Sequence, residues 1–237
     1  MHPYFSAPTP HIFAHRGLAL QCQENTLDAF DAALSAGATH IETDAHGTLD
    51  GVAILFHDDQ LNGRNISDYL HTELPSHIPT LESALNQFPE TRFNIDIKNK
   101  SAVMAVSQVI TKLSAERRIL ISSFSSSRRR SVVKNCPGVA TSASTAQFAP
   151  AFIAALLGQQ WLVNRALKRC EAVQIPARAL GRSTVTPCLI RAYHRAGVHV
   201  DVWTVNEAAE MLALVAAGVD GIVTDRTDIA RRTLINE

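Results

Sequence analysis

Cysteine is scarce in this 237-residue chain. Its four copies stand far apart, at Cys22, Cys136, Cys170 and Cys188, and no Cys-x-x-Cys pair occurs. This spacing indicates free thiols in a reducing compartment and argues against a disulfide framework or a thiolate zinc site. An excess of charge is missing too, because 22 Lys and Arg residues balance 22 Asp and Glu residues. The composition therefore gives no overall attraction to nucleic acid or to an anionic membrane, and we expect no nucleic-acid partner.

Long apolar runs are also missing. The longest apolar stretch, 148–163, is interrupted by Pro150, Gly158 and two glutamines. It is too short and contains too many polar or helix-breaking residues to span a bilayer. The N-terminus has no basic region followed by an apolar core, so no signal peptide is expected. We therefore expect a soluble, cytoplasmic protein. Apolar residues make up 46% of the chain and charged residues 19%, which excludes general disorder.

Strand-like and helix-like patterns alternate along the chain. We predict strands at 12–14, 40–44, 92–97, 118–122, 139–142, 172–175, 198–204 and 220–223. We predict helices at 26–36, 80–88, 101–115, 126–135, 146–168, 187–196, 206–217 and 226–235. Eight such units indicate a closed (β/α)8 TIM barrel, formed by a single domain over 1–237. The rival fold is an open doubly wound sheet, but its nucleotide-binding form lacks the Gly-x-Gly-x-x-Gly turn here.

One interval is too long for a loop and a helix. The surplus, at about 45–78, predicts a short insertion after the second strand. It contains a hairpin pattern in which Leu49-Asp50-Gly51 turns into the apolar run 52–56, which ends at His57. An insertion at the carboxyl end of a barrel strand lies on the face where loops build active sites.

Acidic residues gather at two predicted strand ends. Residues two apart in a strand point to the same side, so Glu42 and Asp44 project together, as do Asp96 and Lys98. Three carboxylates at one barrel mouth repel each other unless positive charge lies between them. A hard divalent cation, which prefers oxygen ligands, is one solution. A salt-bridge network with Lys98 and Arg16 is the other.

Two histidines accompany these carboxylates. His15 ends the first strand beside Arg16, and His57 ends the hairpin of the insertion. Histidine exchanges protons near neutral pH, while arginine binds anions, so this pairing suits acid–base chemistry on an anionic substrate.

Nine motifs carry a family resemblance. In chain order they are His15-Arg16-Gly17, Glu24-Asn25-Thr26, Ile41-Glu42-Thr43-Asp44, Thr48-Leu49-Asp50-Gly51, His57-Asp58, Ile78-Pro79-Thr80-Leu81-Glu82, Asn94-Ile95-Asp96-Ile97-Lys98, Trp203-Thr204-Val205-Asn206 and Asp220-Gly221-Ile222-Val223-Thr224-Asp225. Over about 11–230, the chain resembles the glycerophosphodiester phosphodiesterases. The resemblance implies a metal-dependent hydrolase on a TIM barrel that releases glycerol 3-phosphate and an alcohol.

The resemblance also implies roles for individual residues. Glu42, Asp44 and Asp96 would hold Ca²⁺ or Mg²⁺. His15 and His57 would form the acid–base pair, and Arg16 and Lys98 would bind the phosphate. In the family mechanism, one histidine helps the glycerol 2-hydroxyl attack phosphorus and the other protonates the leaving alcohol. Water then opens the cyclic phosphate.

The chain departs from the family pattern in two places. Asp96 stands where the family usually has glutamate, which makes its metal role the least secure of the three. The usual Arg-Thr-Thr run after His57 is replaced by the shorter 62–65 segment. A smaller lid would leave the mouth open to a bulkier head group or a lipid.

Other residues have interpretations that remain open. Trp203 is predicted to form a site wall against the glycerol or alcohol part of the substrate, with core packing as the alternative. Asn25 and Thr26 are interpreted as the start of the helix at 26–36, and Asn206 and Asp225 as helix caps. Residues 128–130 are interpreted as a solvated helix face, with attraction to phosphate or lipid as the alternative. The apolar segment 148–163 is interpreted as core, as a dimer contact, or as a surface for lysophospholipid or a membrane.

Two other functions remain open at this stage. One is a lysophospholipase D-like or sphingomyelinase D-like phosphodiesterase on the same scaffold. The other is a binding module with weak catalysis, suggested by Asp96 and the shortened insertion. The sequence leaves undecided the head group, the choice between calcium and magnesium, and the oligomeric state.

Overall fold

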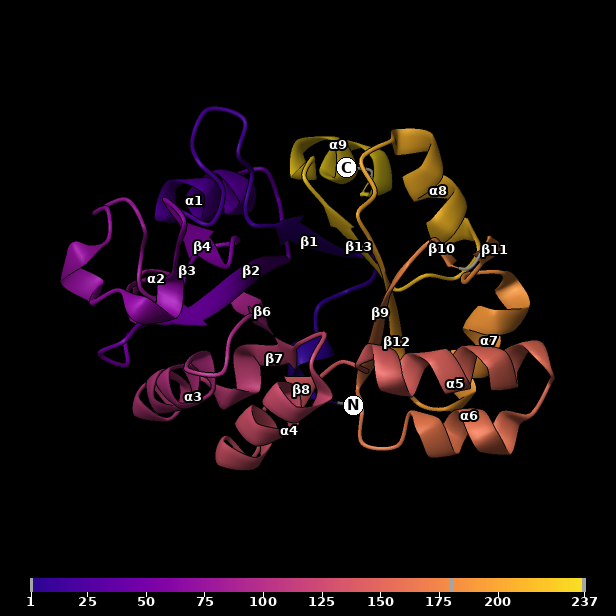
Figure 1. The fold of residues 1–237 in the computed structure, drawn as a ribbon. Coiled ribbons are helices and arrows are strands. Elements are labelled where there is room, and N and C mark those ends of the chain that lie inside the picture. Colours follow the sequence, from indigo (N-terminus) through magenta and orange to yellow (C-terminus); the bar gives the residue numbers. More distant parts are fainter. Residues whose placement is uncertain (1, 180, 236–237) are drawn as a thin grey trace.

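The fold is a nearly closed barrel of parallel strands, seen in a computed structural model that describes residues 2–179 and 181–235 (Figure 1). In this part of the chain the eight barrel strands are β1 (His11–His15), β2 (His40–Gly47), β6 (Arg92–Ile97), β7 (Ile119–Ser122), β8 (Ala140–Thr141), β9 (Ala172–Pro176), β12 (His199–Trp203) and β13 (Gly221–Thr224). They pair in the order β8-β7-β6-β2-β1-β13-β12-β9. A single parallel bridge, Ser142 to Ala172, links the two ends of that order. The predicted α/β TIM-barrel fold is therefore confirmed.

Helices cover the outside of the barrel. They are α1 (Leu27–Ser35), α2 (Leu81–Gln87), α3 (Ala102–Lys112), α4 (Ser126–Asn135), α5 (Thr145–Leu156), α6 (Gln160–Ala166), α7 (Pro187–Arg195), α8 (Ala208–Ala216) and α9 (Thr227–Leu234). Several begin where the sequence provides a hydroxyl cap. The Thr80 Oγ1 atom, for example, accepts a hydrogen bond from the Ser83 amide, 3.0 Å away, at the start of α2. Among the described helices, none has the length and apolar character needed to cross a membrane.

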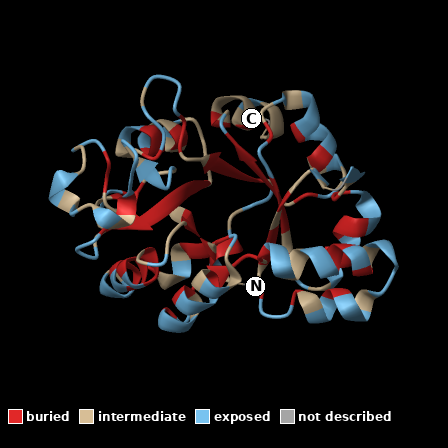
Figure 2. Ribbon diagram, viewed as in Figure 1, coloured by how far each residue is buried: buried red, intermediate tan, exposed pale blue. Residues whose placement is uncertain are grey.

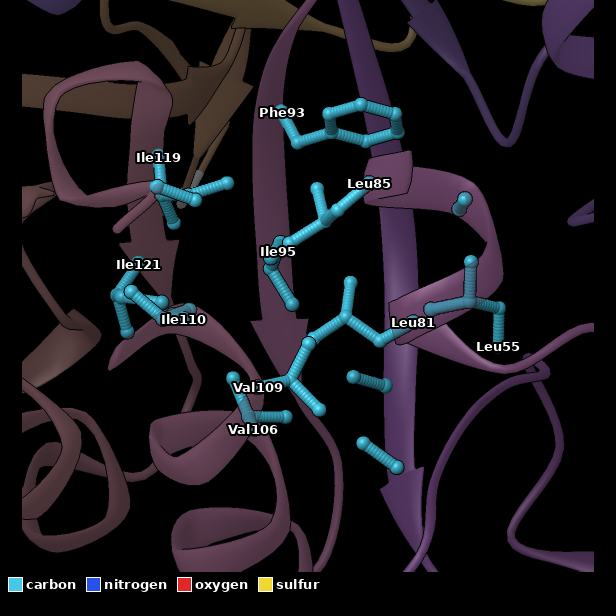
Figure 3. Close-up of a cluster of buried hydrophobic side chains, with 14 of the residues drawn as sticks. Leu55, Leu81, Leu85, Phe93, Ile95, Val106, Val109, Ile110, Ile119 and Ile121 are labelled. Atoms are coloured by element: carbon cyan, nitrogen blue, oxygen red, sulfur yellow. The ribbon is translucent and has the colours of Figure 1, made fainter. Parts of the chain in front are cut away.

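Alternation along each strand separates the two sides of the barrel. In β6, Phe93 and Ile95 face outward and pack under α2 and α3 (Figure 3), and Ile97 belongs to the same buried cluster. Their neighbours Asn94 and Asp96 therefore point into the barrel, because successive side chains of a strand lie on opposite faces. Burying each such apolar side chain contributes about 1.5–3 kcal/mol. The strands are accordingly buried along most of their length, while the helices keep exposed outer faces (Figure 2).

The N-terminal end of the barrel is filled by aromatic rings. The short 3-10 helix η1 (Pro3–Phe5) places Tyr4 and Phe5 in a buried cluster with Phe13. The rings of His11, His40 and His199 lie in the same place, with centroids 4.8 Å apart for His11 and His40. This end of the barrel is therefore a packed layer, and an open cavity lies at the other end.

The segment between β2 and α2 contains the predicted hairpin. β2 pairs antiparallel with β3 (Ala53–Leu55) through the turn at 48–52, and a two-stranded sheet follows, β4 (Gln60–Leu61) with β5 (Arg64–Asn65). The 3-10 helices η2 (Ile66–Asp68) and η3 (His71–Glu73) complete it. Ala45–Gly47 extend β2 beyond the predicted strand end at 44, because they pair with β3.

Two predictions about the helical surface need correction. The region 146–168 is two helices, because Gly158, with φ +68°, ends α5 and lets α6 turn back along it. Residues 128–130 are not all solvated. Arg129 is 4% exposed and donates hydrogen bonds to Thr141 Oγ1 (2.7 Å) and Gln147 Oε1 (2.6 Å), so it connects α4 to β8 and α5.

Candidate active site

A cavity of about 530 Å³ opens at the carboxyl ends of the barrel strands. Its lining includes every residue that the sequence singled out for a role: His15, Arg16, Glu42, Asp44, His57, Asp96, Lys98 and Trp203. They come from the ends of four barrel strands and from the insertion. The carboxyl-terminal face is where barrel enzymes carry their chemistry, so the structure gathers the predicted residues in the place expected of an active site.

His15 is held in a fixed orientation. Its Nδ1–H donates to Asp225 Oδ1 at 2.7 Å, while Nε2 lies 4.0 Å from Glu42 Oε2. Burial lowers the pKa of His15, but the hydrogen bond to Asp225 and the charge of Glu42 outweigh burial, so the pKa is raised overall. The imidazolium form of His15 is therefore stabilised in the site.

Asp225 and Asn206 are residues whose role was misjudged from the sequence. The N-cap of α9 is Arg226 and that of α8 is Glu207, so the helix-cap interpretations are wrong. Instead, Asn206 Nδ2 donates to Asp225 Oδ2 at 2.8 Å, and Asn206 Oδ1 accepts from the Asp225 amide at 2.9 Å. Asn206 thus orients Asp225, which orients His15. Both lie in motifs quoted above, but nothing local to those motifs indicates a partner 210 positions away.

His57 is oriented in a similar manner. Its Nδ1 donates to Asp58 Oδ1 at 2.8 Å, and its side chain is 37% exposed at the cavity. It follows β3 and so reaches the mouth from the insertion. Each of the two histidines therefore uses Nδ1 for an aspartate, which leaves Nε2 available to a ligand.

Asp44 is the carboxylate that pairs with both cationic side chains of the site. Lys98 Nζ lies 3.3 Å from Asp44 Oδ1, and Arg16 Nε lies 3.1 Å from Asp44 Oδ2. Asn25, taken from the sequence only as a helix-starting residue, donates from Nδ2 to Asp44 Oδ2 at 3.0 Å. Lys98 also lies 3.6 Å from Asp96 Oδ2. The predicted ion pairs of Arg16 and Lys98 with the carboxylates are thus present.

Glu42 is the carboxylate with the least compensation. Its Oε2 accepts one hydrogen bond, from the Arg16 amide at 3.3 Å. Burial, together with the neighbouring charge of Asp44, raises the pKa of Glu42 to about 8. Burial also raises the pKa of Asp96. Without a further cation, Glu42 would be largely protonated at neutral pH.

These residues fit a divalent cation by their chemistry. In the part of the chain that the structure describes, no three His, Cys, Asp or Glu side chains are gathered closely enough to enclose a metal ion. The donors are nevertheless carboxylate oxygens, which hard cations prefer. Burial and the charge of Asp44 raise the pKa of Glu42, so its ionised form lacks compensating positive charge. A cation beside Glu42 and Asp44 would supply that charge.

The opposite wall of the cavity is apolar. Trp203 ends β12 and Phe124 follows β7, and their rings meet edge to face with centroids 6.5 Å apart. Phe148, from the first turn of α5, lies on the same cavity. Ser122 and Ser123 line it as well. A ligand in this cavity would therefore meet charged groups on one side and aromatic rings on the other.

Cations, carboxylates and histidines around one barrel mouth suit a barrel enzyme that performs acid–base chemistry on an anionic substrate. Residues 15–229 match the model of the glycerophosphoryl diester phosphodiesterase family, and the chain belongs to this family. It is accordingly a phosphoric diester hydrolase, and this family is generally metal-dependent.

A curated relative supports the family assignment, and solved structures support the fold. The chain is 37% identical over 237 residues to the probable glycerophosphodiester phosphodiesterase 2 of Mycobacterium tuberculosis, which covers 94% of this chain and 89% of the relative. A putative glycerophosphoryl diester phosphodiesterase structure from Silicibacter pomeroyi has a TM-score of 0.81 at 21% identity, over 99% of this chain and 98% of that one. An Oleispira antarctica phosphodiesterase, solved with the product sn-glycerol-3-phosphate, has a TM-score of 0.76 at 20% identity, over 96% and 97% of the two chains.

Proposed function

We propose that this protein hydrolyses glycerophosphodiesters to sn-glycerol 3-phosphate and an alcohol in the cavity described above. The observation that carries the proposal is the pair of histidines. Each is fixed through Nδ1 by an aspartate, and both line a cavity that also holds two cationic side chains for a phosphate. The product bound to the Oleispira antarctica relative fits this substrate class.

The two histidines would share the proton transfers. His57 takes the proton of the glycerol 2-hydroxyl as its oxygen attacks phosphorus. His15, whose imidazolium form Asp225 stabilises, gives its proton to the leaving alcohol oxygen as the phosphorus–oxygen bond breaks. Water then opens the cyclic phosphate, with the two histidines in exchanged roles, and leaves sn-glycerol 3-phosphate.

Positive groups would stabilise the charge on phosphate. Arg16 and Lys98 bind its nonbridging oxygens, and Trp203 forms the wall against the glycerol or alcohol part. A Ca²⁺ or Mg²⁺ ion held by Glu42, Asp44 and Asp96 would add Lewis-acid stabilisation of the same oxygens. Asp96 is shorter than glutamate and already close to Lys98, so it is the weakest of the three proposed ligands.

Enzyme assays test this function directly. We expect glycerophosphodiesters to release sn-glycerol 3-phosphate, EDTA to abolish the activity, and added Ca²⁺ or Mg²⁺ to restore it. His15→Ala and His57→Ala should each lower kcat by about 10²- to 10⁴-fold. Full activity in both variants would refute the acid–base assignment. Activity that survives exhaustive chelation would refute the metal proposal.

A second substrate class follows from the apolar wall. Phe124, Phe148 and Trp203 offer a surface that a short polar alcohol does not need, whereas an acyl chain would bury it. A lysophospholipase D-like reaction would then release lysophosphatidic acid or its cyclic form. A panel of glycerophosphodiesters and lysolipids, each assayed with either metal, distinguishes the two by product. The cytoplasmic location and the single domain over 1–237 stay predictions from the sequence.

A further inference from the structure

The neutral net charge conceals a strong asymmetry. Residues 117–200, which we call the basic sector, contain 13 of the 22 Lys and Arg residues but only one of the 22 Asp and Glu residues, Glu171. The sector supplies β7, β8 and β9 and the helices α4 to α7. β7 pairs with β8, β8 is bridged to β9, and α7 contacts both α5 and α6. These helices follow one another from the lower centre to the right in Figure 1, so one side of the barrel is positive.

An exposed apolar patch lies within this sector. Five of the exposed large apolar side chains in the described part of the chain lie in one ten-residue stretch of the α5–α6 hairpin, 153–162. They are Ile153, Leu156, Leu157, Trp161 and Leu162, which we call the α5–α6 patch. Leu157 and Trp161 are each 68% exposed. Both helices already bury an inner face through Phe152 and Val163, so the patch is surplus to the core.

Basic side chains border the patch. Arg165 lies over the Trp161 ring, with its guanidinium carbon 5.6 Å from the ring centroid. Lys168 is exposed two residues after the end of α6, and Arg195 of α7 donates to Gln160 Oε1 at 3.1 Å. Residues 136–170 contain no Asp or Glu. The patch is thus apolar at its centre and positive at its border.

We propose that the α5–α6 patch docks on the surface of a bilayer that contains anionic phospholipid. Leucine and tryptophan side chains insert at the level of the head groups, while lysine and arginine beside them pair with lipid phosphates. A second copy of the chain fits less well. A two-fold contact would place the same patch on both partners and bring the two basic borders together.

The patch shares helix α5 with one residue of the catalytic cavity. Phe148 lines that cavity and precedes Ile153 on the same helix by five residues, or about 7 Å along the axis. The docking itself does not depend on the proposed chemistry, and it is measured without turnover.

Vesicle flotation of the full chain tests the proposal. We expect binding to vesicles of phosphatidylcholine with phosphatidylglycerol, little binding to phosphatidylcholine alone, and weakening by salt. Arg165→Gln with Lys168→Gln should lower the partition coefficient by about 10- to 30-fold, and Trp161→Ser by about tenfold or more. A blue shift of tryptophan emission on vesicle addition should be absent from Trp161→Phe.

Leu212→Ser provides the matched control, because Leu212 is 52% exposed on α8, outside the basic sector. It should bind vesicles as the unaltered chain does. Three outcomes overturn the proposal: no binding to anionic vesicles, equal binding to neutral and anionic vesicles, or a solution dimer that Trp161→Ser dissociates. The glutamine variants leave the apolar centre intact, so they test the charge even if Trp161→Ser is poorly folded.

Discussion

At the scale of single residues, the site depends on how aspartates set the chemistry of histidines. The chain Asn206–Asp225–His15 fixes one imidazole through two hydrogen bonds of 2.8 and 2.7 Å. An aspartate that accepts from Nδ1 also stabilises the positive imidazolium, which a proton donor to the leaving alcohol requires. In the proposed mechanism, Asp225 would therefore act through His15, as a positioning residue.

Asp225→Asn tests this arrangement. We expect kcat to fall by about 10- to 100-fold with little change in KM, because the ring loses its orientation and its electrostatic partner but the phosphate-binding groups remain. Steady-state kinetics on a glycerophosphodiester gives both values. Asp228→Asn is the matched control, since Asp228 pairs with Arg226 away from the cavity, and it should keep its kcat. An equal loss in the control would remove the special role of Asp225.

A second aspartate, Asp201, costs stability. It is fully buried inside the barrel, Oδ1 has no hydrogen-bond partner among the described residues, and burial raises its pKa well above the usual value. A raised pKa means that the unfolded chain loses the proton first as pH rises above about 4. The free energy of unfolding contributed by this group therefore decreases from there toward the folded-state pKa.

Asp201→Asn should consequently stabilise the fold by about 1–3 kcal/mol near neutral pH. Urea unfolding at about pH 7 and about pH 4 measures the effect. The gain should shrink at the lower pH, where Asp201 is protonated in the folded chain and about half protonated in the unfolded chain. A destabilised variant at neutral pH would contradict the argument.

At the scale of elements, the contact between β8 and β9, which closes the barrel, has the least strand pairing. β8 spans only Ala140–Thr141, and its link to β9 is a single bridge. Side chains supplement that join. Arg129 of α4 reaches Thr141 in β8 and Gln147 in α5, and Gln147 Nε2 in turn contacts Cys170 Sγ at 3.2 Å, just before β9.

Arg129→Ala should therefore lower the free energy of unfolding by about 2–3 kcal/mol, because buried acceptors on two elements lose their donor. Its neighbour Arg130 is exposed, and Arg130→Ala should change stability by no more than about 0.5 kcal/mol. Chemical denaturation of the two variants side by side gives the comparison. Equal effects would mean that Arg129 is as dispensable as a surface arginine.

At the scale of the whole molecule, the barrel has a packed end and a reactive end. Three histidines, His11, His40 and His199, fill the packed end with aromatic rings. Burial lowers the pKa of all three in the folded protein. Above about pH 6.5 they are neutral in both states. Below that pH the histidines bind protons in the unfolded chain but not yet in the folded chain, so the free energy of unfolding decreases as pH falls.

The contribution of one such histidine can be isolated. The free energy of unfolding, measured by urea at several pH values between about 5.5 and 7, should decline less steeply in His40→Gln than in the unaltered chain. The difference in slope should approach about 1.4 kcal/mol per pH unit. His77→Gln alters an exposed histidine and should leave the slope unchanged. Identical slopes in all three proteins would contradict this account.

The sequence by itself determined the barrel fold and which acidic residues lie at its mouth. Alternation in strands and apolar faces in helices follow from local geometry, so Glu42, Asp44 and Asp96 could be assigned to one side of their strands without any contact being known. The carboxyl ends of parallel strands meet at one mouth, so those residues had to meet there too.

Only the tertiary structure decided which side chains became partners. Asp225 binds His15, Asn25 binds Asp44 and Arg129 joins three elements, although each had a sound local interpretation as a cap, a helix start or a solvated face. Caps and helix faces depend on neighbours within one turn, whereas these bonds join residues brought together when the barrel closes. A sequence pattern carries no information about which distant residues meet when the barrel closes. Tertiary packing therefore decided between interpretations that were locally equivalent.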